Sequence, residues 1–508
     1  MVQVIKRDGR EVDFETQKIV IAVEKAMKET EKGIDETAAK EVGEAVHEKY
    51  KDSDKVSIEE IQDLVEFELM KRAPEAAKKY ILYREERTRL REEGWAMTNL
   101  QRDIYDKKYR YDGENFEGFI KRVSGDNDVI GKAIKDKKFM PAGRILAGRG
   151  LDKKGKKVTL SNCYVMPKVD DNIESIFDTA KRLARTYSYG GGCGINISKL
   201  RPKGARVNNA ASTTTGAVSF MDLFALTTGL IGMRGRRGAL MINMDVSHPD
   251  IMEFIDVKND LSKVNSANIS VNVNDEFLKA VKEDTNYTLR FDVESSGEEI
   301  RKEVRARDLW NTLAKNNWNM AEPGILYWDR INSWHIMSAD ENFSYAGVNP
   351  CAEEPLPAWG SCNLSSINLG AFVRDPFTDY GRFDFEAFAN LVREGVFYLN
   401  GVLDENENLH PIKEQRELAH NLRQIGLGIM GLADMFIKLK IKYGSPESIK
   451  LIHQIGRLMI NEALKASAEL AKKDGPFPFF NKEAVLKSEF IRSNADDDTL
   501  EMIEKYGF

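Results

Sequence analysis

The sequence predicts an α/β protein: a sheet or barrel of short apolar strands alternating with helices, preceded by a small, mainly helical module. Two observations carry this prediction. Apolar residues recur at helical spacing in several stretches, for example over residues 172–188. Short apolar runs such as 363–369 lie between these stretches and are typical of buried strands. The 508 residues allow about two to four domains, and 42% hydrophobic residues suffice for a large core.

The first 92 residues form the predicted N-terminal module. Asp8-Gly9 is a strong hairpin-turn signal, so residues 2–14 are expected to form two strands around a turn. Ser57 followed by Glu60 is a capping box at the start of a helix. Four helices are expected after the hairpin, over residues 15–30, 35–50, 57–70 and 74–92.

Three basic residues of this module are candidates for phosphate contacts. Lys6 and Arg7 flank the hairpin turn, and Lys18 begins the helix after it. Charges in such places are equally typical of a solvated surface, so the residues alone leave both interpretations open.

A helical region and a cysteine-bearing strand follow the module. Residues 93–140 are polar, aromatic-rich and predicted to be mostly helical, and a turn at 139–144 ends this region. A buried strand carrying Cys163 is expected over 159–167. The side chains of residues 170–172, two aspartates and an asparagine, can cap the helix that comes next.

Two glycine-rich segments were considered as ligand loops. Residues 190–196 permit positive φ and close backbone approach, but they lack the G-x-G-x-x-G order after a strand and the Walker lysine. Neither a dinucleotide site nor a P-loop is therefore predicted. The basic glycine loop 233–238, between a helix beginning near Ala217 and a strand over 239–244, can wrap a phosphate or a base, or be a simple exposed turn.

The second half of the chain continues the alternation. Residues 282–306 are predicted to be an excursion with a strand over 287–293 and a turn at 295–297. Residues 424–433 are a glycine-studded apolar strand or turn leading into a helix. Further strands are expected over 265–271, 323–327 and 363–369, and further helices over 275–281, 306–319 and from 384 onward.

One stretch places an amide, a thiol and a carboxylate at alternate positions: Asn349, Cys351 and Glu353. Pro350 disfavours helix for the residue before it, so the stretch is expected to be extended, with the three side chains facing one point. A hydrogen-bonding amide, a sulfur and a base aimed at one point outline a reaction site. The alternative is a surface loop holding one buried cysteine.

Composition excludes several classes of protein. The formal net charge of −6 gives no bulk electrostatic case for nucleic-acid binding. No stretch approaches the roughly 20 apolar residues of a membrane span, and the N-terminus carries no apolar signal core. Four cysteines without C-x-x-C spacing make neither a disulfide scaffold nor a zinc site, and no metal site is predicted. A reducing cytoplasm is the expected location.

The N-terminal module resembles the ATP-cone, a regulatory domain that binds ATP or dATP. The resemblance rests on the run from Val4 to Arg10, on Phe14, on Lys18-Ile19 and on the segment 80–84. It implies that Lys6, Arg7 and Lys18 contact the nucleotide.

The whole chain resembles the catalytic chain of ribonucleotide reductases. The motifs that carry this resemblance are Ser161-Asn162-Cys163, Gly194-Ile195-Asn196-Ile197, Gly238-Ala239, His248-Pro249-Asp250-Ile251, Pro323-Gly324-Ile325, Asn349-Pro350-Cys351-Ala352-Glu353, Ser361-Cys362-Asn363-Leu364 and Arg423-Gln424-Ile425-Gly426-Leu427-Gly428. The implied activity is radical reduction of ribonucleotides, expected to be diphosphates, to 2′-deoxyribonucleotides for DNA synthesis. The implied fold is a ten-stranded α/β barrel with Cys351 on a loop threaded through its centre. The implied domains are an ATP-cone (1–92), a helical region (93–160) and the barrel (161–508).

The resemblance also implies roles for five residues. Cys351 becomes a transient thiyl radical and abstracts the ribose 3′-hydrogen, Glu353 accepts the 3′-hydroxyl proton, and Asn349 hydrogen-bonds the ribose hydroxyls. Cys163 and Cys362 supply two electrons, protonate the departing 2′-hydroxyl and end as a redox-active disulfide. The chemistry agrees, because a radical must be kept from water and the reductant must be a dithiol that can open and close.

Nucleotide-binding residues follow from the same resemblance. Ser161, Asn162 and Gly192 are expected to bind the substrate. Effector deoxynucleotides are expected near Asp170, which can equally be a plain helix cap, and at two loops over 204–214 and 232–238. Arg206 lies in the first loop and Arg237 in the second.

The radical source and the partners are expectations of the same kind. The segments 190–200, 235–241 and 349–357 look most like class II chains, which use adenosylcobalamin; the alternative is a class I chain served by a separate radical-generating subunit. Residues 501–508 stop where the family continues into a Pro-Thr-Gly turn, and the family's C-terminal cysteine pair is absent. A barrel incomplete in this chain, with exposed sheet edges, is therefore expected, together with a C-terminal fragment that completes it.

Further expected partners are a thioredoxin- or glutaredoxin-type reductant and a second copy of the chain. Two other classes were weighed. A non-catalytic nucleotide-binding regulator would need none of the thiols that this chain retains. A thioredoxin-type oxidoreductase would need a C-x-x-C motif, which is absent.

Overall fold

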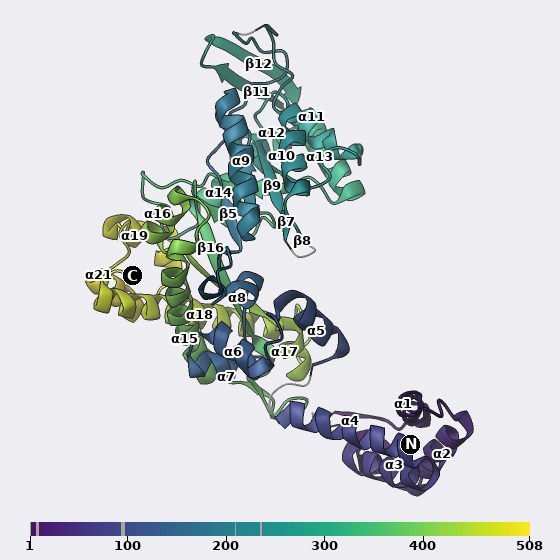
Figure 1. The fold of residues 1–508 in the computed structure, drawn as a ribbon. Coiled ribbons are helices and arrows are strands. Elements are labelled where there is room, and N and C mark those ends of the chain that lie inside the picture. The colour runs from purple at the N-terminus through teal and green to yellow at the C-terminus, as the bar shows by residue number, and fades with distance from the viewer. Residues whose placement is uncertain (1, 7–9, 93–96, 209, 234–235) are drawn as a thin grey trace.

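The computed structural model describes residues 2–6, 10–92, 97–208, 210–233 and 236–508 (Figure 1). The N-terminal module lies at one end of the molecule, and the long helix α4 (Pro74–Glu92) leads from it towards the rest of the chain. A central sheet with helices on its faces makes up most of the remainder, and the last helices pack beside it (Figure 1).

The N-terminal module has the two predicted strands and the four predicted helices, while the predicted turn at Asp8-Gly9 lies outside the described residues. Strands β1 (Gln3–Ile5) and β2 (Glu11–Asp13) pair antiparallel. A short strand that the sequence reading missed, β3 (Lys55–Ser57), adds parallel to β1. Ser57 and Glu60 form the predicted capping box. The helices before α4 are α1 (Thr16–Lys28), α2 (Glu36–Tyr50) and α3 (Ile58–Arg72).

The region between the module and the central sheet is mostly helical, as predicted. The expected turn at 139–144 is instead strand β4 (Phe139–Pro141) followed directly by a helix, because the backbone of β4 pairs antiparallel with a sheet strand. The helical segments are α5 (Asn99–Ile104), a π-helical turn (Tyr105–Tyr109), α6 (Phe116–Ser124), α7 (Asp128–Lys135) and α8 (Gly143–Gly148).

The largest sheet among the described residues has eight strands, in the order β13-β10-β9-β6-β5-β16-β19 with β4 also pairing β16. Its remaining members are β5 (Cys163–Val165), β6 (Gly192–Asn196), β9 (Leu240–Asp245), β10 (Asn268–Val273), β13 (Gly324–Tyr327), β16 (Ser361–Asn368) and β19 (Ile425–Met430). The strands from β5 to β13 are parallel, and β16 and β19 are parallel to each other.

The two groups of parallel strands meet antiparallel at β5 and β16. The outer strands β13 and β19 do not pair with each other, so the sheet of the described residues is open rather than a closed ten-stranded barrel. An α/β barrel half with unpaired edges is therefore the architecture of this chain.

The two faces of the sheet differ in polarity. On β10, Ile269 and Val271 join a large apolar core, whereas Ser270 and Asn272 point to the other face. Asn243 of β9 is the register partner of Ser270, so that face is polar across neighbouring strands. The apolar face packs against helices, and the polar face is free to hold a reaction site.

Helices cover the apolar face on both sides of the antiparallel junction. Beside β5 to β13 lie α9 (Ile173–Tyr189), α10 (Met221–Leu230), α11 (Ile251–Asp256), α12 (Asp275–Glu283) and α13 (Ala306–Met320). Beside β16 and β19 lie α15 (Phe385–Asn406), α17 (Leu432–Lys438) and α18 (Pro446–Asp474), with a second core between them. Two shorter helices are α14 (Trp328–Ser333) and α16 (Lys413–Leu422).

Four two-stranded ribbons lie outside the central sheet. The longest ribbon is the segment predicted over 282–306, in which β11 (Asn286–Val293) pairs antiparallel with β12 (Glu298–Arg305). Strand β12 was not predicted, because most of its residues are charged. The others are β7 (Gly232–Met233) with β8 (Arg236–Arg237), β14 (Gly347–Val348) with β15 (Pro355–Leu356), and β17 (Val373–Arg374) with β18 (Arg382–Phe383).

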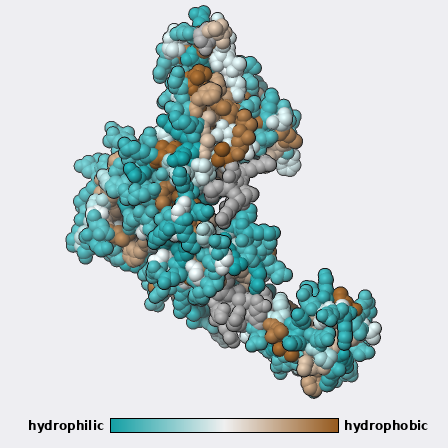
Figure 2. Space-filling view, viewed as in Figure 1, coloured by the Kyte–Doolittle hydropathy of each residue, from teal (hydrophilic) through white to brown (hydrophobic). Residues whose placement is uncertain are grey.

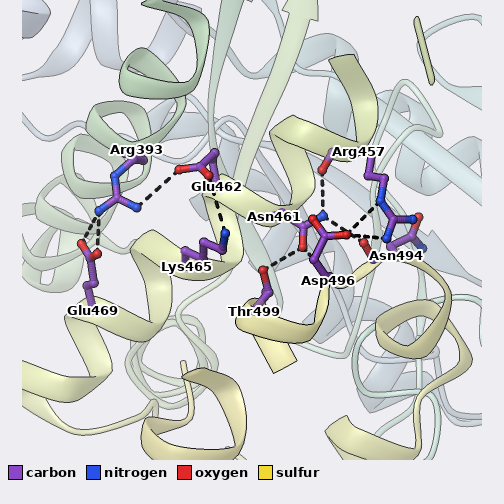
Figure 3. Close-up of polar contacts among 9 residues, drawn as sticks. All are labelled: Arg393, Arg457, Asn461, Glu462, Lys465, Glu469, Asn494, Asp496 and Thr499. Atoms are coloured by element: carbon purple, nitrogen blue, oxygen red, sulfur yellow. Dashed lines mark hydrogen bonds and ion pairs between the residues drawn. The ribbon is translucent and has the colours of Figure 1, made fainter. Parts of the chain in front are cut away.

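Polar contacts hold the last helices to the sheet domain (Figure 3). Arg393 of α15 donates to Glu469 of α18 at 2.6 Å. The buried Asn461 of α18 accepts from the backbone N–H of Asp496 and from the Thr499 hydroxyl, both at 2.7 Å. It also donates to the carbonyl oxygen of Asn494 at 3.0 Å. This side chain therefore joins α18 to α20 (Glu489–Asn494) and α21 (Asp497–Tyr506).

The same helices hold the chain segment that precedes the candidate reaction site. The Ser488 hydroxyl, at the start of α20, donates to the carbonyl oxygen of His335 at 2.8 Å. Asn481, the cap of α19 (Lys482–Lys487), donates to Asp340 at 3.2 Å. Met337 is buried in a small core with Val485 and Ile503. Residues 335–340 are thereby fixed a few residues before Asn349. In the described part of the chain, no helix has the length and apolar character to cross a membrane.

Candidate active site

The stretch from Asn349 to Glu353 forms the turn of a hairpin and is not extended. Strands β14 and β15 pair on either side of it, and the backbone N–H of Asn349 donates to the Glu354 carbonyl oxygen at 3.1 Å. The N–H of Ala352 donates to the Asn349 carbonyl oxygen, and Ala352 has a φ of 69°. The expectation of one shared face at alternate positions is therefore wrong. Pro350 is accommodated in the turn, which the side chain of Asn349 closes by accepting from the Glu354 N–H at 3.0 Å.

Two glycines of β6 allow this hairpin to lie on the polar face of the sheet. A Cβ atom at Gly194 would be 1.7 Å from the Val348 carbonyl oxygen, and one at Gly192 would be 2.9 Å from the Cγ atom of Pro350. Asn268 of β10 donates to the Pro350 carbonyl oxygen at 2.8 Å. The glycine run therefore serves close approach of the hairpin, and Gly192, an expected substrate residue, lies beneath Pro350.

Cys163 and Cys362 are register partners across the antiparallel junction of β5 and β16. Both are free thiols, with relative exposures of 9% and 1%. A hydrogen bond from the Cys362 thiol, supported by one from Asn349, lowers the pKa of Cys163. The same bond to Cys163, together with burial, raises the pKa of Cys362. The sheet thus brings together two thiols that are far apart in the chain, as the resemblance implied.

Asn349 connects the hairpin with this thiol pair. Its side chain is fully buried, and its Nδ2 atom donates to the Cys163 sulfur at 3.4 Å. Its Oδ1 atom holds the turn through Glu354, so both ends of the amide are engaged within the protein.

Cys351 is exposed at the tip of the hairpin. Partial burial, and then the nearby Glu353 carboxylate, raise the pKa of its thiol, which favours the neutral form that carries a hydrogen atom. Glu353 is exposed as well. The resemblance implied a cysteine enclosed at the centre of a barrel. In this open sheet the hairpin covers the polar face, but its tip faces outward.

Glu354 is a site residue that the sequence reading passed over. Its side chain is largely buried, and burial, followed by the charge of Glu353, raises its pKa to about 7. Two consecutive glutamates before a proline were the available signal, but nothing in the sequence shows which of them turns inward.

The other expected substrate residues are held by protein contacts. The buried Ser161 hydroxyl accepts from Asn406 at 2.9 Å and donates to the Ser361 hydroxyl at 3.5 Å. Ser361 precedes Cys362 in β16, so these hydroxyls lie on the face opposite the thiols. The Asn162 side chain accepts from the Arg144 N–H at 3.3 Å.

Asp170 and Arg206 lie near the start of α9, whereas Arg237 precedes Gly238, which packs against Tyr187 at the other end of that helix. Asp170 pairs with Lys199 at 2.9 Å, and Asn172 rather than Asp170 caps the helix by accepting from the Ser175 N–H. The backbone N–H of Arg206 donates to Glu298 of the β11–β12 ribbon at 3.2 Å. Arg237 belongs to β8, but its side chain is outside the described part of the structure.

Two of the three expected ATP-cone contacts, Lys6 and Lys18, are among the described residues. Lys6 is partly buried, and the exposed Lys18 pairs with Glu15 at 2.6 Å. Arg7 lies outside the described residues. No ligand role of these side chains is tested by their positions.

The open α/β sheet, with a hairpin and two paired thiols on one face, defines the class of α/β-barrel proteins, and comparison with known families agrees with this fold. Residues 161–508 match the ribonucleotide reductase barrel domain, and residues 2–89 match the ATP cone domain. The chain belongs to the ribonucleotide reductase family.

Individual relatives are similar over most of the chain. The vitamin B12-dependent ribonucleoside-diphosphate reductase of Thermoplasma acidophilum is 32% identical over 94% of this chain and 72% of its own length. The protein of the same name from Mycobacterium tuberculosis strain H37Rv is 31% identical over 96% of this chain and 71% of its own length. The ribonucleoside-diphosphate reductase large subunit of vaccinia virus is 30% identical over 63% of this chain.

A solved structure supports the fold. The class Id ribonucleotide reductase alpha subunit of Actinobacillus ureae matches 75% of this chain and 69% of its own chain, with a TM-score of 0.62 and 21% identity. The likeness confirms the predicted architecture of the ribonucleotide reductase barrel, here as an open sheet.

Proposed function

We propose that this chain reduces ribonucleoside diphosphates to 2′-deoxyribonucleotides. The observation that carries the proposal is the pairing of Cys163 and Cys362 in the sheet, joined through Asn349 to a hairpin that presents Cys351. The names of the relatives from Thermoplasma and Mycobacterium support the substrate class.

The thiol pair is the proposed source of two electrons. Its two S–H bonds and the ribose C–O bond at C2′ break, a C–H bond and an S–S bond form, and the hydroxyl leaves as water. The dithiol is oxidised to a disulfide and the ribose is reduced, so atoms and electrons balance. Burial of both sulfurs keeps this exchange away from bulk solvent.

Cys351 and Glu353 are the proposed hydrogen-atom and proton acceptors. Cys351, once converted to a thiyl radical, takes the 3′-hydrogen, and the exposed Glu353 carboxylate takes the 3′-hydroxyl proton. Asn349 would have to exchange a protein contact for the ribose hydroxyls, because both ends of its amide are engaged.

Adenosylcobalamin is the proposed radical source, in line with the names of the first relatives. When bound, it supplies the homolytic chemistry that removes a hydrogen atom from a thiol. The residues fit such a group, because the turn from Pro350 to Glu353 is open at its tip and Cys351 holds its hydrogen there as a neutral thiol. The alternative, a separate radical-generating subunit, would approach the same exposed tip.

Regulation by nucleotides is part of the proposal. The match to the ATP cone domain supports ATP or dATP binding in residues 2–89, with Lys6, Arg7 and Lys18 as the proposed contacts. The proposed effector residues are Asp170, Arg206 and Arg237. The proposed substrate contacts are Asn162, Ser161 and Gly192, and Ser161 would act only through its backbone.

The chain is proposed to act as a homodimer. Exposed apolar side chains gather on α9 and α10, and Figure 2 shows hydrophobic surface on the part of the molecule that holds these helices. The residues are Ile173, Phe177, Leu226 and Leu230. A face of this kind is typical of a protein–protein contact.

Two further partners complete the proposal. A polypeptide that pairs with the unpaired edges of β19 and β13 would close the barrel over Cys351. A thioredoxin- or glutaredoxin-type dithiol would regenerate Cys163 and Cys362. We place the reaction in the cytoplasm, because the two thiols must return to the reduced form after each turnover.

The test is product formation from CDP with dithiothreitol and adenosylcobalamin. The purified chain is assayed alone and with the product of the reading frame directly downstream of its gene. Formation of dCDP that is lost in Cys351→Ser, while CDP still binds, supports the proposal. Nucleotide binding without any reduction in both arms would favour the regulator instead.

A further inference from the structure

Glu354 is the one titratable side chain of the hairpin that turns toward the sheet. Its backbone is fixed at both ends, because its N–H donates to the Asn349 side chain at 3.0 Å and its carbonyl oxygen accepts from the Asn349 N–H at 3.1 Å. The side chain then extends over β19, where its Oε1 atom lies 3.2 Å from the position that a Cβ atom of Gly426 would occupy.

This position is on the same face of the sheet as the thiol pair. Gly426 is the register partner of Leu364 in β16. Leu364 lies two residues after Cys362, so both side chains point to one face. The carboxyl group of Glu354 therefore lies over the strand next to that of Cys362, at the level of the residue two positions beyond this cysteine.

No cation among the described residues forms an ion pair with the carboxylate of Glu354. Among the described residues, no hydrogen bond or ion pair to its side-chain oxygens is found. The titratable groups that act on it or feel its charge are Glu353 of the same turn, Cys163 of β5, Cys362 of β16 and Tyr345 ahead of β14. All of these are acids, and acids around a largely buried carboxyl favour its protonated form.

The two sulfurs differ in how they can be reached. Cys163 is 9% exposed and Cys362 is 1% exposed, so an attacking thiolate meets the sulfur of Cys163 first. The sulfur of Cys362 then leaves, and Cys362 lies on β16, the strand next to β19, over which Glu354 extends.

We propose that Glu354 is the proton donor to the Cys362 sulfur when the Cys163–Cys362 disulfide is reopened by an external dithiol. This inference rests on the proposed function, because it assumes that the pair cycles between dithiol and disulfide.

The step balances as a thiol–disulfide exchange. A thiolate of the external dithiol attacks Cys163, a mixed disulfide forms, and the bond between Cys163 and Cys362 breaks. The electron pair goes to the sulfur of Cys362, which takes the proton of the Glu354 carboxyl. The second thiol of the reductant then releases Cys163, the reductant ends as its own disulfide, and solvent returns a proton to Glu354.

The measurement is the rate at which dithiothreitol reduces the preformed disulfide in the full chain. Thiols are trapped at intervals by alkylation and counted by mass spectrometry from pH 5.5 to 8.5, and each rate is divided by the thiolate fraction of dithiothreitol. This readout needs no nucleotide reduction, so it separates failure of this inference from failure of the proposed function.

Wild-type protein is expected to show a normalised rate that falls as the pH rises through about 7, where Glu354 loses its proton. In Glu354→Gln the normalised rate is expected not to fall in this pH range. At pH 6 its disulfide is expected to be reduced at least about tenfold more slowly than that of the wild type, which is within the scale of general acid catalysis. Glu354→Asp should recover part of the rate.

Glu353→Gln is the matched control, since it removes the neighbouring carboxylate and leaves Glu354 in place. Its normalised rate should still fall as the pH rises, but the fall should occur at lower pH, because the charge of Glu353 is one cause of the raised pKa of Glu354. A wild-type rate and profile in Glu354→Gln overturn the inference. If that variant does not fold, a flat normalised profile in the wild-type protein overturns it equally.

Discussion

Replacing Gly194 by alanine tests the idea that the glycines of β6 set the position of the hairpin. The added Cβ atom would lie 1.7 Å from the Val348 carbonyl oxygen and 2.8 Å from its carbonyl carbon. Both atoms belong to backbone, so no side-chain rotation relieves the clash. The hairpin must retreat by more than about 1 Å before the contact becomes tolerable.

Such a shift acts on the reaction more than on the fold. Overpacking of this kind costs about 1–3 kcal/mol of folding free energy. The retreat also moves Asn349 away from the Cys163 sulfur, to which it donates at only 3.4 Å. A misplacement of about 1 Å can reduce a rate about 100-fold. We therefore expect Gly194→Ala to fold and to reduce CDP about 100-fold more slowly.

The assay compares dCDP formation and urea unfolding of Gly194→Ala with those of Gly456→Ala. Gly456 lies within α18 and has nothing within 4 Å of an added Cβ atom, so that control should keep its activity and gain up to about 1 kcal/mol. Wild-type activity in Gly194→Ala would refute the reasoning, because the hairpin would then not depend on the space above β6.

Three further predictions concern stability and assembly. Asn461→Ala leaves the buried Thr499 hydroxyl and two partly buried backbone groups without this partner and should cost about 3 kcal/mol in urea unfolding, whereas the exposed Asn408→Ala should stay within about 0.5 kcal/mol. Burial lowers the pKa of His410 to about 4, so below about pH 6.5 the unfolded chain binds more protons than the folded one. The free energy of unfolding should therefore fall by up to about 3 kcal/mol between pH 6.5 and pH 4, and His410→Asn should reduce this fall. Phe177→Glu should convert dimers to monomers in light scattering, while Tyr380→Glu, on another exposed aromatic residue, should not. Equal loss of stability in both asparagine variants, a wild-type slope in His410→Asn, or dimers in Phe177→Glu would contradict the respective prediction.

Periodic elements were predictable because side-chain spacing reports burial directly. The helix predicted over 172–188 is α9, with Ile176, Ala180 and Leu183 buried at helical spacing. The strand predicted over 363–369 belongs to β16. The boundary at residue 92 and the domain limits remain predictions.

The elements that sequence reasoning missed lack such a pattern. Strand β12 carries charges on both faces, and only Ile300 and Val304 are apolar on its inner face, so the alternation is too sparse to indicate a strand. The turn at Asn349 depends on a hydrogen bond from Glu354 to the side chain of Asn349, which no spacing rule reveals. Glu354 becomes a candidate site residue only because its side chain extends over β19, and the sequence does not reveal that direction.

The antiparallel junction of β5 and β16 has a consequence for how the chain endures repeated turnover. Residues facing each other across such a pair have Cα atoms about 4.5–5.5 Å apart, inside the range of about 4.4–6.8 Å that a disulfide tolerates. Cys163 and Cys362 can therefore bond and separate by rotating their side chains while the backbone ladder stays in place. The backbone of the sheet can therefore be the same in the dithiol and the disulfide form. An external reductant of the pair would then meet the same sheet surface in either oxidation state.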